Sequence, residues 1–141
     1  MDVLTTHDQE AIVHAIGVAE NQTSGEIRVA IDRAYQGDPI ARALEYFHRL
    51  EMQKTSQRNG VLIYVAVDSH QFAIVGDQGI NDKVPSDFWE QTKEHMLEFF
   101  RQDQLSEGII AGVADAGVQL SRFFPRAQDD INELPNDLLI G

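Results

Sequence analysis

The stretch that decides the fold is a run of two apolar segments and the turn between them, Asn59-Gly60-Val61-Leu62-Ile63-Tyr64-Val65-Ala66-Val67-Asp68-Ser69-His70-Gln71-Phe72-Ala73-Ile74-Val75. Residues 61–67 are apolar at every position, which is typical of a central strand covered on both faces. Residues 68–70 are turn formers, and residues 71–75 make a second strand. We therefore predict a β-hairpin whose first strand lies inside the sheet.

A strand and a helix precede this hairpin. Apolar and other residues alternate from Ile27 to Ile31, which predicts a strand with one buried face. Asp38 can cap the next helix, and Pro39 suits its first position because its missing N–H costs nothing there. That helix is expected to run toward Gln57. Because strand–helix–strand units join parallel strands, residues 26–67 predict a parallel pair.

A further helix is predicted near the N-terminus. Thr5 or Thr6 can cap it, and Thr23-Ser24-Gly25 ends it. Apolar residues recur at helical spacing on one side, which leaves Glu10 and Glu20 off the apolar stripe. This helix is therefore expected to pack one face on the sheet.

Two more helices follow the hairpin. Ser86 can cap the first and Ser106 can cap the second, which ends at Pro125. The predicted order is α-β-α-β-β-α-α. It indicates an α/β fold, a three-layer α/β/α sandwich. Its small mixed sheet, a parallel pair plus an antiparallel hairpin strand, carries helices on both faces.

Length and composition limit the function. The chain has 141 residues, which fits a single domain over residues 1–141 with a polar C-terminal tail over residues 126–141. It contains no cysteine, so disulfides, thiol nucleophiles and Cys-ligated zinc are excluded. The formal net charge of -12 argues against nucleic acid and against an anionic membrane surface as partners.

The targeting signals are also informative. The N-terminal residues lack the basic and apolar regions of a signal peptide. The longest apolar run, residues 61–67, is far shorter than the roughly 20 residues that cross a bilayer. A cytoplasmic location without membrane insertion is therefore expected.

Strand direction sorts the acidic residues. Glu26 begins the first strand, and Asp77, Asn81 and Asp82 follow the returning strand, so all four are expected at one end of the sheet. Glycines in the same loop let backbone carbonyls approach closely. Oxygen ligands of this kind suit Ca²⁺ or Mg²⁺ rather than zinc. The sequence therefore predicts a divalent-cation site formed by these residues.

Two alternatives remain open at this point. Asp77 and Asp82 can simply cap turns, with Glu26 a solvated strand end. The opposite end of the sheet carries Asp32 and Asp68, and it is the weaker candidate because a turn already explains Asp68.

Four segments resemble, in order, the TPM domain family, named after a thylakoid lumen protein, Psb32 and MOLO-1. They are Thr23-Ser24-Gly25-Glu26-Ile27-Arg28-Val29, Asn59-Gly60-Val61-Leu62-Ile63-Tyr64-Val65, Phe72-Ala73-Ile74-Val75-Gly76-Asp77-Gln78-Gly79-Ile80 and Glu107-Gly108-Ile109-Ile110-Ala111-Gly112-Val113. The resemblance spans residues 10–125. It implies an α/β sandwich with a divalent-cation site among acidic residues, and an acid phosphatase activity.

The chain also departs from the family pattern. Many members have Gly-Tyr-Gly-Leu-Glu in the loop, where this chain has Gly76-Asp77-Gln78-Gly79-Ile80-Asn81, with Asp82 as the following acid. Many bacterial members have a signal peptide and a membrane segment, and the residues of this chain lead us to expect neither. The chain is thus similar to a soluble bacterial branch of the family.

Three functions are compatible with these features. The leading hypothesis is divalent-cation binding. The second is a metal-assisted acid phosphatase, for which Arg28 and Arg58 are the candidate phosphate-binding residues. The third is a protein-interaction module that uses the acidic surface or the C-terminal tail.

Overall fold

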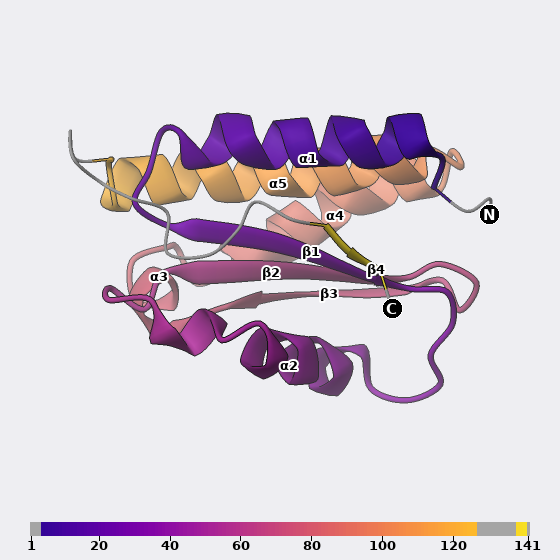
Figure 1. Cartoon of the computed structure of the whole chain (residues 1–141), viewed down its shortest axis with the longest axis horizontal. Coiled ribbons are helices and arrows are strands. Elements are labelled where there is room, and N and C mark those ends of the chain that lie inside the picture. Colours follow the sequence, from indigo (N-terminus) through magenta and orange to yellow (C-terminus); the bar gives the residue numbers. More distant parts are fainter. Residues whose placement is uncertain (1–3, 127–137, 141) are drawn as a thin grey trace.

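A four-stranded sheet lies between two layers of helices in the computed structural model, which describes residues 4–126 and 138–140 (Figure 1). The strands are β1 (Glu26–Asp32), β2 (Gly60–Ala66), β3 (Gln71–Gly76) and β4 (Leu138–Ile140), in the spatial order β3-β2-β1-β4. β1 pairs in parallel with β2 and β4, and β3 pairs antiparallel with β2. The predicted mixed sheet of a parallel pair and a hairpin strand is confirmed.

The helices form the outer layers of the sandwich. On one face of the sheet lie α1 (Thr6–Glu20), α4 (Phe88–Phe100) and α5 (Leu105–Phe123), and on the other lies α2 (Pro39–Arg49) (Figure 1). Two short helices, the 3₁₀ turn Met52–Lys54 and α3 (Gln78–Asn81), flank the start of β2 and the end of β3. The three-layer α/β/α arrangement expected from the sequence is therefore confirmed.

Local signals set the starts of the first two helices correctly. Thr5 caps α1: its side chain accepts from Asp8 N, and the Asp8 carboxylate accepts from Thr5 N in return. Asp38 caps α2 and Pro39 occupies its first turn. This helix ends at Arg49 rather than near Gln57, because Glu51 adopts a left-handed backbone conformation with φ 58°.

The predicted caps of the last two helices were wrong. Ser86 lies in a turn closed by Phe88 N donating to Pro85 O, and α4 begins only after it. Ser106 lies inside α5, which begins at the buried Leu105. A buried apolar residue at the start of α5 thus outweighs the capping preference of serine.

The burial of β1 also differs from the expectation. All seven of its residues are buried, although alternation predicted one exposed face. β1 lies between β2 and β4, and helices cover both faces, so no side of it meets solvent. Its polar residues Arg28 and Asp32 are buried with charged partners. The alternation of apolar and polar residues along β1 therefore reflects buried, paired charges and not a solvent-exposed face.

The last segment that the structure describes pairs with the edge of β1 that faces away from β2. Residues 138–140 form β4 and pair with Val29–Ile31, so this part of the tail adds a strand. The rest of the predicted tail, from 127 to 137, and residue 141 lie outside the described residues. Within the described part, none of the helices is both long and apolar enough to span a membrane.

Candidate functional site

One end of the sheet gathers the residues predicted to bind a cation. Glu26 lies in register with Gly60, and Asp77 N donates to Gly60 O at 2.9 Å. The main chains of Glu26 and Asp77 therefore flank the same residue of β2. Because neighbouring strands are roughly 4.8 Å apart, the main chains of these two acidic residues lie about 10 Å from each other, across β2.

Glu26 belongs to a buried ionic group. Its Oε2 accepts from Arg28 Nη2 at 3.3 Å, and Arg28 Nη1 donates to Glu20 Oε2 at 2.8 Å. Glu20 and Glu26 have side chains that are 0% and 1% exposed, and Arg28 is 3% exposed. The guanidinium of Arg28 is thus committed to two carboxylates inside the protein.

Glu20 was missed by the sequence analysis, which left it off the apolar stripe of the first helix. Its Oε2 accepts from Ile27 N at 2.7 Å as well as from Arg28, so this carboxylate joins the end of α1 to the start of β1. The available signal was Arg28 itself. An arginine inside a buried strand needs a carboxylate partner, and Glu26 and Glu20 are the first two acids that precede it in sequence.

Asp77 is held by an arginine from the preceding loop. Arg58 Nε donates to its Oδ2 at 2.7 Å and Nη2 donates to its Oδ1 at 2.8 Å, while Gln78 N donates to Oδ1 at 2.8 Å. The Asp77 side chain is 7% exposed, whereas that of Arg58 is 50% exposed. Hydrogen bonds and charge from Asp77 raise the pKa of Arg58 above its ordinary value. Asp77 therefore already binds one cationic group.

Asn81 and Asp82 end the one-turn helix α3 that Asp77 caps. Asn81 Nδ2 donates to Gly76 O at 2.7 Å, and Asn81 Oδ1 accepts from Trp89 Nε1 at 2.8 Å. The Asp82 side chain is exposed and bonds to none of the residues that the structure describes. The structure thus places all four predicted residues at one end of the sheet without gathering their oxygens around one point.

The described residues show no finished metal centre. Across residues 4–126 and 138–140, no three His, Cys, Asp or Glu side chains form a group that could hold a metal ion. The cation site at Glu26, Asp77, Asn81 and Asp82 stays a prediction. As the side chains stand, a cation would have to replace Arg58 at Asp77.

The loop that carries Asp77 is fixed against residue 58. Gly79 N donates to Arg58 O at 2.7 Å, and a Cβ at Gly79 would lie 2.1 Å from Gln57 O and 2.6 Å from Arg58 O. We expect Gly79→Ala to lower the free energy of unfolding by about 1–3 kcal/mol, because the added methyl group would clash with backbone atoms that can move only by distorting the loop. Urea denaturation measures the loss, and Gln78→Ala, at an exposed neighbouring site, is the control. Equal losses in both variants would contradict the close packing at Gly79.

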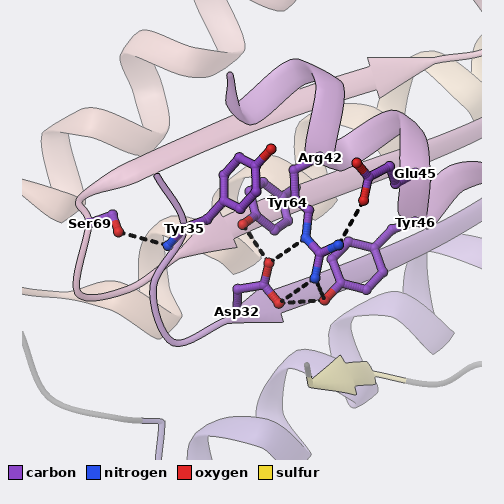
Figure 2. A network of polar contacts seen from close by, with 7 residues as sticks. All are labelled: Asp32, Tyr35, Arg42, Glu45, Tyr46, Tyr64 and Ser69. Atoms are coloured by element: carbon purple, nitrogen blue, oxygen red, sulfur yellow. Dashed lines mark hydrogen bonds and ion pairs between the residues drawn. The ribbon is translucent and has the colours of Figure 1, made fainter. Parts of the chain in front are cut away.

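The opposite end of the sheet carries a second polar group, centred on Asp32 at the end of β1 (Figure 2). Arg42 Nε donates to Asp32 Oδ2 at 2.8 Å, Tyr64 Oη donates to Oδ2 at 2.7 Å, and Tyr46 Oη donates to Oδ1. Arg42 Nη1 also bonds Glu45 Oε2 at 2.8 Å. Asp32 is 5% exposed, so its negative charge is balanced almost entirely by these donors.

The titration of this group follows from its contacts. Burial raises the pKa of Asp32, but hydrogen bonds from Arg42, Tyr46 and Tyr64 outweigh it, and the net pKa lies below the ordinary 3.8. Burial, and then the hydrogen bond to Asp32, raises the pKa of Tyr64 well above 10.0. Asp32 is therefore ionised and Tyr64 neutral at pH 7.

Sequence reasoning found the location of Asp32 but not its partners. Tyr64 was counted among the apolar residues of the central strand, and Arg42 and Tyr46 were not singled out. The available signal was spacing: Arg42 and Tyr46 are four residues apart on one helix face. Asp32 ends β1, and Tyr64 lies in the neighbouring strand two residues before the partner of Asp32. These donors occupy the carboxylate, so the network ties α2 to the sheet and leaves Asp32 little capacity for another ligand.

Comparison with known proteins gives a matching family and structures with a similar fold. The family model described as the TPM domain (TPM phosphatase) matches residues 1–119. The NMR structure of the BA42 protein from the psychrophilic bacterium Bizionia argentinensis is 45% identical, with a TM-score of 0.91 over 99% of this chain and 97% of that chain.

Two more distant NMR structures share the fold. One is the N-terminal domain of a protein from P. gingivalis, with 16% identity and a TM-score of 0.68 over 89% of this chain and 82% of that chain. The other is the N-terminal domain of the cg2496 protein from Corynebacterium glutamicum, with 13% identity and a TM-score of 0.59 over 92% and 80%. A search of the curated proteins found no match. From the family match over residues 1–119, the chain belongs to the TPM domain family.

Proposed function

We propose that this TPM domain binds a divalent cation, Ca²⁺ or Mg²⁺, at the loop that begins with Asp77. One observation carries the proposal: Asp77 is a nearly buried carboxylate whose present cationic partner, Arg58, is half exposed. A carboxylate fixed by the fold beside a displaceable guanidinium is suited to exchange that guanidinium for a metal ion. The resemblance of the loop to that of the family supports the same location.

In this proposal the ligands come mainly from the loop itself. Asp77 and Asp82, which flank α3, supply carboxylates, and Asn81 and loop carbonyls supply neutral oxygens. Glu26 lies two strands away from Asp77, on the other side of Gly60, and contributes its negative charge rather than a direct bond to the cation. Ca²⁺ takes 6–8 oxygen ligands, and two carboxylates supply only some of them, so water molecules fill the remaining positions. We expect a weak site, with Kd on the order of 0.1–1 mM.

Arg58 and the cation compete for Asp77, and this competition gives the test. Arg58→Gln removes the competitor and is expected to lower the Kd for Ca²⁺ by about fivefold or more, the low end of typical coupling between sites. Asp77→Asn is expected to abolish measurable binding. Isothermal titration calorimetry with CaCl₂, repeated with MgCl₂, measures both effects.

The opposite end of the sheet offers a matched control. Arg33 also pairs with an aspartate, Asp68, at 3.1 Å and is more exposed than Arg58. Arg33→Gln should therefore leave the Kd unchanged if the cation sits at Asp77. Tighter binding in Arg33→Gln but not in Arg58→Gln would assign the cation to the other end and overturn the proposed site.

A metal-assisted phosphomonoesterase is the second candidate, favoured by the phosphatase designation of the matched family model. Of its two candidate phosphate-binding residues, Arg28 is buried between carboxylates, whereas Arg58 is half exposed. We expect hydrolysis of a chromogenic phosphate ester in the presence of Mg²⁺ to fall in Asp77→Asn. Equal rates in the wild type and in Asp77→Asn would contradict this function.

A further inference from the structure

A hollow separate from both polar groups is lined by residues of the β2–β3 turn and of the α4–α5 turn, at the end of the sheet where β2 ends. Its volume is about 370 Å³, within the range of roughly 300–1,000 Å³ typical of small-molecule pockets. In α/β proteins, ligands bind preferentially outside the carboxyl ends of the parallel strands. The hollow therefore has the size and the place of a ligand site.

The floor of the hollow is apolar. Phe72 of β3 packs edge-to-face on Phe100 of α4, with ring centroids 5.1 Å apart, and both rings are only partly buried. Leu97 is also half-buried, and Val65 and Leu105 close the bottom. Covering these partly exposed side chains with an apolar ligand removes carbon surface from water, which favours binding. The floor thus selects an alkyl or aryl group.

The rim of the hollow carries hydrogen-bond donors with no partner among the described residues. Arg101 and His70 line it, and neither side chain forms an ion pair or hydrogen bond with any residue that the structure describes. Arg101 is well suited to bind a carboxylate through two parallel hydrogen bonds.

The start of α5 adds to the positive character of this rim. α5 runs for 19 residues, begins at Leu105 in the lining, and has no side-chain cap at Gln104. The first N–H groups of a helix lack internal acceptors and carry its positive dipole end. One acidic residue, Asp103, also lines the hollow and opposes this effect.

From the apolar floor and the guanidinium of Arg101 beside it, which pairs with none of the described residues, we propose that the hollow binds a small amphipathic carboxylate, such as a medium-chain fatty acid. The alkyl chain lies over Phe72 and Phe100, and the carboxylate accepts hydrogen bonds from Arg101 and from the His70 ring. This site is independent of the proposed cation site, which lies at the opposite end of the sheet.

Titration with decanoate, followed by amide NMR, tests this inference. We expect saturable shifts at residues 70–72 and 97–105. Arg101→Gln should weaken binding by about fivefold and Asp103→Asn should strengthen it about twofold, as expected for single exposed charges. Asp103 has a φ of 59°, a conformation that asparagine also tolerates, so the second variant keeps the turn.

Decyltrimethylammonium, with the same chain length and the opposite charge, separates charge recognition from apolar binding. It should bind at least about fivefold more weakly than decanoate. Equal binding of both compounds, weaker decanoate binding in Asp103→Asn, or no shifts at millimolar decanoate would each overturn the inference. Shifts confined to the apolar groove between α1 and α5, around Val18 and Val118, would do so as well.

Discussion

Replacing Arg28 by methionine is expected to lower the free energy of unfolding by about 3–5 kcal/mol, the usual cost of leaving buried charges without their partner. Arg28 is almost fully buried and bonds Glu20 at 2.8 Å and Glu26 at 3.3 Å. Methionine fills a similar volume but brings no positive charge, so two nearly inaccessible carboxylates lose their guanidinium. Chemical denaturation at pH 7 measures the loss.

A second variant and a control isolate the electrostatic cause. Adding Glu20→Gln to Arg28→Met should recover part of the stability, because one buried negative charge is removed. Lys54→Met breaks an exposed pair with Glu51, at 3.0 Å, and should cost at most about 1 kcal/mol. A loss below about 1 kcal/mol in Arg28→Met, or a double variant less stable than the single one, would contradict this account of the buried group.

Asp32→Asn is expected to cost about 2–3 kcal/mol at pH 7, since hydrogen bonds to a charged group contribute about 1.5–3 kcal/mol. In the wild type, Arg42, Tyr46 and Tyr64 all donate hydrogen bonds to the Asp32 carboxylate. The asparagine side chain replaces one acceptor oxygen by an NH₂ group, so these three donors cannot all remain bonded. Asp68→Asn, in a half-exposed pair at the same end of the sheet, is the matched control. It should change stability by no more than about 0.5 kcal/mol.

The pH dependence of the Asp32 effect has a definite sign. The pKa of Asp32 in the folded protein lies below its ordinary value of 3.8. A depressed carboxyl pKa adds stability that is present above the unfolded-state pKa and lost as the pH falls through the folded-state pKa. The difference between wild type and Asp32→Asn should therefore shrink as the pH falls below about 4.

The tyrosines report the same network at alkaline pH. Burial and Asp32 raise the pKa of Tyr64, so its neutral form adds stability below pH 10 that is lost as the pH rises through the folded-state value. In Asp32→Asn, ultraviolet titration should show that Tyr64 ionises at a lower pH than in the wild type. An unchanged tyrosine titration would contradict the direct bond between these side chains.

Most of the fold was predictable because its signals are local. The apolar run from 61 to 67, the turn at 68–70 and the Asp38-Pro39 helix start each determine structure within a few residues. The strand β4 was not predictable, because Leu138–Ile140 carries no periodic pattern and pairs with a strand more than 100 residues away. Long-range pairing of a short segment leaves almost no trace in local sequence.

The candidate site was predicted in place but not in detail. Strand direction alone brings Glu26 and Asp77 to one end of the sheet, as it brings Asp32 to the other. Which arginine meets which carboxylate depends on side-chain packing: Arg58 reaches Asp77 from a loop 19 residues earlier. Arg28 and Arg58 were considered for phosphate, and in the structure both are bound to carboxylates of the protein.

Residue-resolved amide NMR during titration with CaCl₂ tests the proposed cation site most directly. The account predicts saturable shifts centred on residues 76–83 and Arg58, with a midpoint on the order of 0.1–1 mM. It also predicts that these shifts vanish in Asp77→Asn, while the residues around Asp32 stay unmoved. No shift in residues 76–83 at several millimolar calcium, or shifts confined to the Asp32 and Asp68 end of the sheet, would contradict it.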